Sequence, residues 1–255
     1  MEAAPRPART SSRDANDRVD YDVGWTKWSD MVRYYPSGVH RRRIIKSWVA
    51  ALAPSSVLDV GCGTGELLCE LRERLPGCSF LGVDQAAQQV ERNRGLFPWA
   101  EFQALDLSAS ALDRRCDVVI CSEVLEHVPD DERALDHLVA MTGRHLLLTV
   151  PAGPLYPLET GFGHLRHYDL AALGARLTRR GLRIARAEAW GLPFMTLFKW
   201  AANLRPEATL EGFGDGAWSP TKRLVGKALT ALFYLNVPGR GPQLFVLAER
   251  PDVGG

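Results

Sequence analysis

Three glycines at alternate positions mark a turn that can approach a ligand closely. Residues 57–60 read as a buried strand, Gly61, Gly63 and Gly65 follow, and a helical pattern begins directly afterwards. Glycine has no Cβ in the way of a ligand, and the first N–H groups of the following helix point towards the bound group. Asp59 stands two residues before the first glycine. The spacing differs from the G-x-G-x-x-G of dinucleotide-binding turns.

Two further aspartates stand where later strands are expected to end. Asp84 closes one apolar run and Asp106 closes the next. Ligands of open α/β sheets lie beyond the carboxyl ends of the strands, and a carboxylate offers about four lone-pair sites, enough for both hydroxyls of a ribose. We therefore expect Asp84 to bind a ribose. Capping of the next helix by Asp84, and of its own loop by Asp106, are the alternative roles.

Carboxylates and imidazoles gather in two later segments. Glu123, Glu126 and His127 follow a fourth apolar run, and His164 and His167 follow a fifth. Imidazole titrates near neutral pH, so the three histidines are candidate general bases. Carboxylates with an imidazole are also suitable ligands for a divalent ion. A packing role is the alternative to both.

The glycine turn with its preceding aspartate resembles the first motif of class I S-adenosylmethionine (SAM)-dependent methyltransferases. The resemblance covers residues 57–150 well and the flanks loosely. It implies that the turn holds the methionine end of SAM, and that Asp106 and the backbone amide of Leu107 meet the adenine. The SAM-binding positions implied are Asp59, Gly61, Gly63, Gly65, Asp84, Asp106, Leu107 and Ser122.

The Glu-x-x-Glu-His arrangement is similar to that of two groups within this family. In ubiquinone-pathway O-methyltransferases and small-RNA 3′-terminal 2′-O-methyltransferases, such side chains bind a divalent ion with a downstream histidine. The likeness implies that Glu123, Glu126 and His127 could hold Mg²⁺, which would lower the pKa of a substrate hydroxyl. Many SAM-dependent methyltransferases without a metal also carry Glu-His here, so the ion is not favoured.

The elements that must position these residues alternate along the chain. Such alternation predicts a doubly wound α/β fold with a mostly parallel, seven-stranded sheet and right-handed crossovers, the Rossmann-like fold that the resemblance implies. The expected strands are 56–60, 79–83, 100–105, 116–121, 144–150, 182–189 and 243–249. The expected helices are 37–52, 65–75, 86–95, 130–142, 169–180, 193–204 and 220–235, with a Gly-rich loop between the last two.

Composition shifts divide the chain into four parts. Residues 1–18 are polar with no apolar run, which excludes a secretory signal and predicts a disordered tail. We expect a helical cap at 19–54, a SAM-binding methyltransferase domain at 55–250, and within it a helical insertion at 191–240.

Two of these parts, the helical cap and the helical insertion, carry apolar side chains to which a function can be assigned. In the cap, Tyr21, Trp25 and Tyr34 could cover the SAM sulfonium, because aromatic faces attract cations, or could pack on the sheet. Residues 193–204 and 224–237 could form a lid over a lipophilic acceptor, a homodimer contact or a membrane contact, in that order of preference.

The loop after the fifth strand is long enough to suggest a function. We expect it to form one wall of the acceptor pocket. Arg166 and Tyr168 could hold an acidic or hydroxyl group of the substrate, or could pin the loop to the fold.

Charge and composition limit the partners. The formal net charge of the 255 residues is +1, with 46% hydrophobic and 24% charged residues. Such a chain has no general attraction for nucleic acid, so we expect no DNA partner and disfavour RNA; Arg41-Arg42-Arg43 is expected on a solvated helix face. Five cysteines without C-x-x-C spacing, and no apolar run of about 18 residues, favour a soluble, cytoplasmic protein without a transmembrane segment.

The sequence thus favours a SAM-dependent methyltransferase that methylates a hydroxyl of a small lipophilic, sugar or secondary-metabolite acceptor. N- or C-methylation, metal-dependent RNA 2′-O-methylation and a non-catalytic SAM-fold subunit are alternatives. A nicotinamide-dependent oxidoreductase is disfavoured by the glycine spacing and by the lack of a Tyr-x-x-x-Lys pair.

Overall fold

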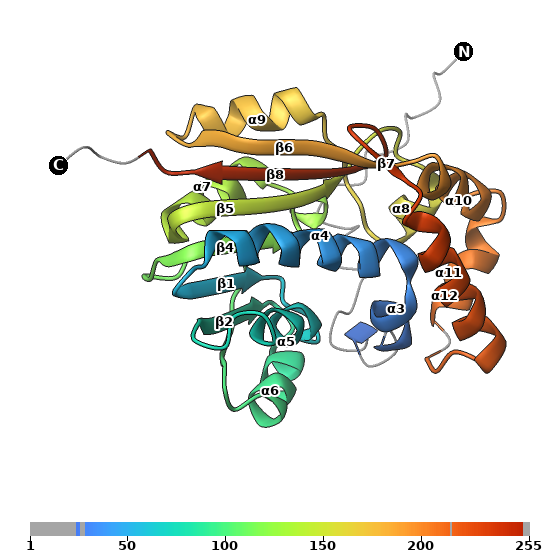
Figure 1. The fold of residues 1–255 in the computed structure, drawn as a ribbon, viewed down its shortest axis with the longest axis horizontal. Coiled ribbons are helices and arrows are strands. Elements are labelled where there is room, and N and C mark those ends of the chain that lie inside the picture. The colour runs from blue at the N-terminus through green and yellow to red at the C-terminus, as the bar shows by residue number, and fades with distance from the viewer. Residues whose placement is uncertain (1–23, 26–28, 215, 252–255) are drawn as a thin grey trace, which may run out of the picture.

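An eight-stranded sheet forms the centre of the protein, shown here by a computed structural model that describes residues 24–25, 29–214 and 216–251 (Figure 1). Its strands are β1 (Ser56–Val60), β2 (Ser79–Asp84), β3 (Glu101–Ala104), β4 (Cys116–Ser122), β5 (Thr142–Pro151), β6 (Arg183–Leu192), β7 (Val237–Pro238) and β8 (Gln243–Glu249). The spatial order is β3-β2-β1-β4-β5-β8-β6-β7. Strands β1 to β5 pair in parallel, and β8 runs antiparallel to both β5 and β6. The predicted doubly wound, mostly parallel sheet is confirmed.

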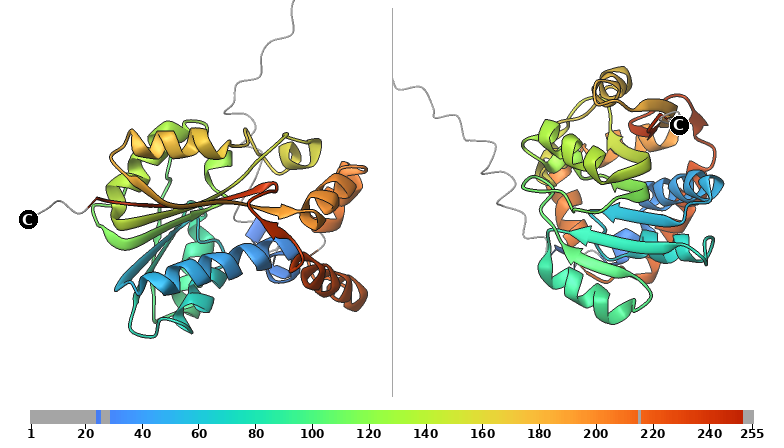
Figure 2. Two further views of the ribbon diagram at one scale, coloured as in Figure 1. Left: turned by 45° about the horizontal axis from the view of Figure 1, so that its top comes forward. Right: turned by 90° about the vertical axis from the view of Figure 1, so that its left-hand side faces the viewer.

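Helices cover both faces of this sheet (Figure 2). They are α3 (Ser29–Tyr34), α4 (Pro36–Leu52), α5 (Glu66–Arg72), α6 (Ala87–Leu96), the 3₁₀ turn η1 (Leu125–His127), α7 (Asp131–Met141), α8 (Pro157–Gly161), α9 (Leu170–Thr178), α10 (Phe194–Ala202), α11 (Pro206–Gly214) and α12 (Pro220–Phe233). Buried side chains of α7 and α9 form the core on one face, while those of α4, α5 and α6 form the core on the other. Alternate residues of each strand serve the two cores: Val119 and Cys121 of β4 join the first, and Val118 and Ile120 join the second.

The insertion before the last strand differs from its prediction. The expected Gly-rich loop is instead largely helix α11, which begins at Pro206 and runs up to Gly214. Proline suits the first turn of a helix, and glycine suits its end, so these glycines terminate a helix rather than form a long loop. The eighth strand, β7, has two residues, too few to show an alternating pattern. The predicted tail at 1–18 and the aromatic residue Tyr21 lie outside the described residues.

The fold brings the carboxyl ends of β1, β2 and β4 to one edge, with β1 between the other two. The chain leaves β1 towards β3 by way of β2 on one side and towards β5 by way of β4 on the other, so a topological switch point lies beside β1. Open α/β sheets bind ligands at this place.

Helix α12 is anchored to the rest of the molecule through one side. Its Gly226 lies so close to the cap that an added Cβ would come within 2.9 Å of the Tyr34 carbonyl oxygen. Phe233 is fully buried, with ring centroids 5.8 Å from Phe198 and 6.3 Å from Trp190. None of the described helices combines the length and the apolar character that a membrane crossing requires.

We predict that Phe233→Ala lowers the free energy of unfolding by about 3–5 kcal/mol, because it removes a fully buried ring and leaves a cavity. The matched control, Leu235→Ala, removes a side chain that is 64% exposed and should change stability by no more than about 0.5 kcal/mol. Urea unfolding followed by circular dichroism measures both values. Equal effects of the two substitutions would contradict this anchoring of α12.

Candidate active site

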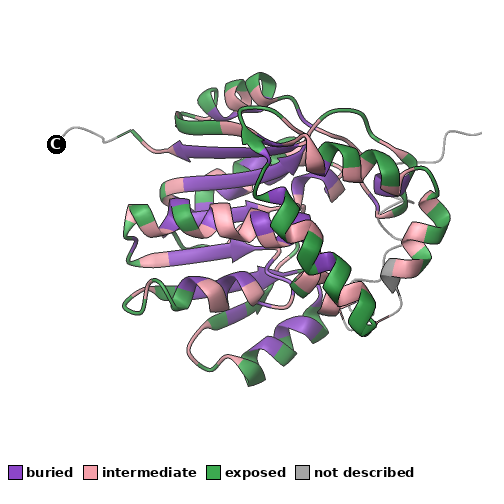
Figure 3. Cartoon of the chain, turned by 45° about the vertical axis from the view of Figure 1, so that its right-hand side comes forward, coloured by how far each residue is buried: buried purple, intermediate pink, exposed green. Residues whose placement is uncertain are grey.

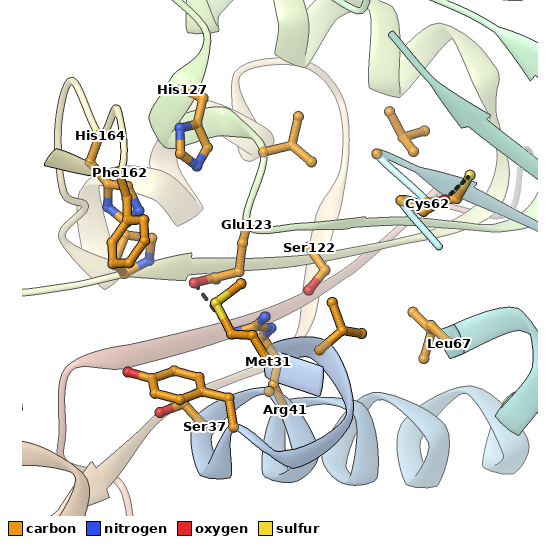
Figure 4. Close-up of a pocket in the computed structure, with 18 of the residues that line it drawn as sticks. Met31, Ser37, Arg41, Cys62, Leu67, Ser122, Glu123, His127, Phe162 and His164 are labelled. Atoms are coloured by element: carbon orange, nitrogen blue, oxygen red, sulfur yellow. Dashed lines mark hydrogen bonds and ion pairs between the residues drawn. The ribbon is translucent and has the colours of Figure 1, made fainter. Parts of the chain in front are cut away.

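A cavity of about 670 Å³ opens at the switch point of the sheet (Figure 4). Its walls come from α3 and α4 of the cap, the glycine turn after β1, the ends of β2 and β4, the loop after β5, and helices α8 and α10. A volume of this size suits a small-molecule ligand.

The glycine turn is held from three directions. The amide of Gly63 donates a hydrogen bond of 2.8 Å to Oδ2 of Asp84, and its carbonyl oxygen accepts one of 2.7 Å from the side-chain amide of Asn93. The Trp25 ring closes the third side, because a Cβ added to Gly63 would lie 2.7 Å from that ring. With φ at +49°, Gly63 therefore needs both the conformational freedom and the small size of glycine. No motif or spacing indicated that Asn93 would be buried here.

Most of the predicted SAM-binding residues line this single cavity. Those that do so are Asp59, Gly61, Gly63, Asp84, Asp106, Leu107 and Ser122. Gly65 is not among the lining residues; it is the N-cap of α5, with φ at +75° and the Phe97 ring against it. Its contribution is to the start of the helix.

The aspartates at the ends of β2 and β3 cap loops and face the cavity at once. Asp84 Oδ1 accepts from the Ala86 amide at 2.9 Å, in addition to the bond from the glycine turn. Asp106 Oδ1 accepts from the amide and the hydroxyl of Ser108 at 2.8 and 2.7 Å. Asp106 thus caps its own loop, as its alternative role predicted. Asp84 does not cap α6: the N-cap is Ala86, which has no side-chain cap, and Asp84 bonds the amide of Ala86 in the turn before the helix. A carboxylate has about four lone-pair sites, so both can also face a ligand.

Asp59 is an acid buried beside the cavity. It is only 3% exposed, and burial raises the pKa of its carboxyl to about 8, with the charge of Asp84 adding to the shift. A positive charge placed beside these two carboxyls would offset both effects.

Glu123 lines the half of the cavity that also contains His127 and His164. Its backbone is left-handed, with φ at +58°. Its carboxylate accepts from Gln243 Nε2 at 2.8 Å and pairs with Arg41 Nη1 at 3.4 Å. The prediction that Arg41 lies on a solvated helix face is wrong: Arg41 lines the cavity, and its neighbour Arg42 pairs with Glu70 at 2.8 Å. The triple-arginine segment is shared between the cavity and the packing of the cap.

The three candidate bases form one chain of imidazoles. The rings of His127 and His164 meet edge to face with centroids 4.8 Å apart, and both residues line the cavity. His164 Nδ1 lies 3.3 Å from His167 Nε2, and His167 Nδ1 lies 3.2 Å from the Gly153 carbonyl oxygen. That oxygen can only accept, so His167 carries its proton on Nδ1, and its Nε2 then accepts from His164 Nδ1. Neutral His164 is left with a lone pair on Nε2.

Burial keeps these imidazoles neutral. It lowers the pKa of His127 and His167, and lowers that of His164 to about 2, with the neighbouring His127 and His167 as the next causes. A neutral imidazole keeps a lone pair that can accept a proton, although the burial that lowers its pKa also makes it a weaker base.

Glu126 lies buried beneath the same cluster. Neither of its carboxyl oxygens has a hydrogen-bond partner among the described residues, and burial, followed by the charge of Glu123, raises the pKa of this carboxyl well above its usual range. Ligand atoms of Glu126, His127 and His164 lie within 4.8 Å of one another. One carboxylate and two imidazoles suit a transition metal or zinc better than Mg²⁺, which prefers oxygen ligands. Of the three predicted ligands, Glu123 is the one engaged by Arg41 and Gln243 instead.

Helices α8 and α10 form an apolar wall of the cavity, which the sequence predicted only in general terms. Leu158 and Phe162 come from α8 and its end, and Met195 and Phe198 come from α10. Lys199 pairs with Glu159 at 3.1 Å and ties the two helices together.

Arg166 and Tyr168 pin the loop after β5 rather than face the cavity. Arg166 Nη2 donates to the Pro129 carbonyl oxygen at 2.8 Å, and the Tyr168 hydroxyl donates to Asp131 at 2.8 Å. Neither lines the cavity.

Of the cap aromatics, Trp25 lies against the glycine turn and lines the cavity; that it covers the sulfonium stays a prediction. Tyr34 does not face the cavity; its ring lies against Trp218 with centroids 6.3 Å apart. The adjacent Tyr35 lines the cavity instead, and burial raises the pKa of its phenol to about 12. Adjacent residues at the start of a helix point in different directions, which sequence alone did not resolve here.

Comparison with known proteins identifies the family of this chain. Residues 37–187, more than half of the chain, match the family described as a methyltransferase domain. The chain is 32% identical over 111 residues to trans-aconitate 2-methyltransferase of Rhodopseudomonas palustris (43% of each chain), and 32% identical over 156 residues to ubiquinone biosynthesis O-methyltransferase of Pseudomonas paraeruginosa (56% of this chain and 66% of that one). These matches span less than two thirds of either relative.

Solved structures share the fold. Magnesium protoporphyrin IX methyltransferase from Synechocystis PCC 6803, solved with bound SAM, aligns with a TM-score of 0.57 and 17% identity. The alignment covers 97% of this chain and 100% of that chain.

We predict that acid destabilises the protein through the neutral histidines. An unfolded chain protonates histidine near pH 6.5, whereas folded His164 stays neutral to about pH 2. The unfolded state therefore binds more protons below pH 6.5, and the free energy of unfolding falls as the pH drops below that value. His164→Gln should reduce this slope by up to about 1.4 kcal/mol per pH unit. Urea unfolding at several pH values between about 5 and 8 tests this; parallel curves for both proteins would contradict it.

Proposed function

We propose that this chain, which belongs to the family of methyltransferase domains, transfers the methyl group of SAM to a hydroxyl of a small molecule. One observation carries the proposal: a single cavity joins the aspartates at the ends of β1 and β2 to the neutral histidines after β4 and β5. The first group suits the cofactor, and the second suits removal of a proton from an acceptor.

The residues at the switch point fit SAM. The glycine turn lines the cavity, Asp84 faces it where a ribose would lie, and Asp106 with the Leu107 amide stands where an adenine would lie. Trp25 presents an aromatic ring beside the turn, and such rings attract cations. SAM, when bound, supplies a methyl group that its sulfonium has already activated. The chain's part is then to align the acceptor and to exclude water.

His164 is the proposed general base. Its Nε2 lone pair accepts the proton as the hydroxyl oxygen binds the methyl group and its O–H becomes strongly acidic, which so weak a base requires. His167 holds the ring in the tautomer that leaves this lone pair free. His127, which also lines the cavity, is the neighbouring candidate. An oxygen acceptor is supported by this arrangement and by the relative named as an O-methyltransferase. The apolar wall of Met195 and Phe198 supports a lipophilic acceptor.

A metal-assisted form of the same reaction is the second candidate. It is supported by the cluster of Glu126, His127 and His164, in which a buried carboxyl has no hydrogen-bond partner among the described residues. These residues would hold the ion, and the ion would lower the pKa of the acceptor hydroxyl. Buried carboxyls are costly without a partner, and a bound cation would supply one.

We predict that the protein binds SAM and its demethylated product, and that Asp84→Ala and Asp106→Ala each weaken both by at least about tenfold, because each removes charge-assisted hydrogen bonds. Isothermal titration calorimetry measures the affinities. The control is Asp113→Ala, an exposed carboxylate outside the cavity, which should bind as the unmutated protein does. No binding by the unmutated protein would remove the central claim.

We predict that His164→Gln lowers kcat by about 10²–10⁴-fold with SAM affinity unchanged, because glutamine cannot accept the proton. A radiolabelled-methyl transfer screen against phenols, sugars and lipids supplies the acceptor for this assay. His167→Gln, which keeps a hydrogen-bonding group, should cost less than His164→Gln.

Chelation separates the two candidates. If EDTA leaves the activity of the unmutated enzyme intact, the metal is excluded and the histidine acts alone. If EDTA abolishes activity and Zn²⁺ or Mn²⁺ restores it, the cluster acts as a metal site, and the general-base role of His164 is wrong.

A further inference from the structure

Helix α12 is apolar on the side that faces away from the protein. Its inward side carries the buried Gly226 and Phe233. At 100° per residue, the opposite side forms an apolar stripe, interrupted near the start of the helix by the exposed Thr221. The exposed apolar residues of this stripe, including Leu235 just after the helix ends, are Leu224, Val225, Ala228, Ala231, Leu232 and Leu235. Leu224 and Leu235, at the two ends of the stripe, are 67% and 64% exposed. A surface helix ordinarily turns a polar side to water.

Helix α10 extends this apolar surface. Leu197 and Trp200 are 57% and 58% exposed, and α10 packs beside α12. The exposed stretches of both helices appear on the same side of the molecule in Figure 3. On its other side, α10 presents Met195 and Phe198 to the cavity. One helix therefore separates the proposed acceptor cavity from the outward apolar surface.

The charges beside the stripe are all positive. Residues 216–242 contain Lys222, Arg223, Lys227 and Arg240 and no aspartate or glutamate. Arg223 is neutralised by Asp30 at 2.9 Å, whereas Lys227 and Arg240 are exposed and have no ion pair among the described residues. Of the acids that precede this segment in the sequence, the exposed Glu207 and Glu211 belong to α11, which packs on α8; Asp215, directly before the segment, lies outside the described residues.

We propose that the outward face of α12 and α10, made up of the stripe with Leu197 and Trp200, docks on the surface of an anionic lipid bilayer. A helix that lies in a bilayer interface buries an apolar side and places lysines and arginines at the headgroups. On the helical wheel, the exposed Lys227 lies beside the edge of the stripe, where its long side chain can reach anionic headgroups, whereas Lys222 lies near the inward side and donates to the Gly212 carbonyl oxygen. The exposed Trp200 has the amphipathic ring that interfaces favour.

A second copy of the chain fits this face less well. A two-fold contact places the same surface on both partners, so the lysines and arginines of one copy would meet those of the other. Residues 216–242 offer no carboxylate to pair with them. Charge therefore favours a negative surface over a self-contact.

The test is co-sedimentation with vesicles. We expect the full chain to bind vesicles of phosphatidylcholine containing about 30% phosphatidylglycerol, to bind pure phosphatidylcholine vesicles much less, and to lose binding as salt is added. The double substitution Leu224→Ser with Leu235→Ser should reduce the partition constant of the protein onto the vesicles by at least about tenfold. Lys227→Gln with Arg240→Gln should weaken binding to the anionic vesicles alone.

The matched control is Leu96→Ser on α6, which removes a leucine that is 66% exposed but lies outside this face. It should bind vesicles as the unmutated protein does, and circular dichroism confirms that all variants are folded. The proposal is overturned if the unmutated protein does not bind anionic vesicles, or if Leu96→Ser loses as much binding as the double variant. A dimer in solution that the double variant abolishes, without vesicle binding, would assign the face to a second copy instead. SAM affinity, measured on the same samples, reports on the proposed function separately.

Discussion

The carboxylate of Asp84 is the contact on which the arrangement of the site depends. One of its oxygens accepts from the Gly63 amide and the other from the Ala86 amide, so a single side chain ties the turn after β1 to the start of α6. The amides of Gly61 and Cys62 both donate to the Val83 carbonyl oxygen and draw the turn the same way. These bonds fix the turn in the left-handed conformations that glycine permits. The side chains of Val124 and Trp25 occupy the places that Cβ atoms on Gly61 and Gly63 would need, so the turn lines the cavity with its backbone.

The other half of the site is built differently, because burial keeps most of its titratable side chains uncharged instead of hydrogen bonds holding charged ones in place. Burial holds His127, His164 and His167 neutral and favours the protonated form of Glu126. The carboxylates of Glu123 and Glu159, which also line this half, are each paired with a cation, Arg41 and Lys199 respectively. A site built in this way offers proton acceptors without strong fields, which suits an uncharged acceptor next to a cationic cofactor better than a charged one.

The sequence predicted what local spacing determines and missed what packing determines. Strand ends and helix starts follow from periodicity, so Asp59, Asp84 and Asp106 could be placed at one edge of the sheet from their positions alone. Arg41, by contrast, lines the cavity and pairs with Glu123 after β4, and Arg42 lines the cavity as well; no spacing within a triple arginine shows which members turn inward. The choice of Tyr35 over Tyr34, and the helix at 206–214, likewise depend on contacts with α10, α12 and α8 that lie far away in the sequence.

Helix α10 joins the two proposals, because it is apolar on both sides. The fold needs only its inner side, where Met195 and Phe198 complete the cavity wall and Phe198 packs on Phe233; nothing in the described core accounts for Leu197 and Trp200 outside. An α-helix with its side chains is about 10–12 Å across, so a bilayer against the outer side would lie one helix diameter from the cavity. A lipophilic acceptor would then leave the bilayer and reach the neutral histidines without crossing bulk water, and the ion pair between Lys199 and Glu159 is the polar contact that it would meet at the boundary between α10 and α8.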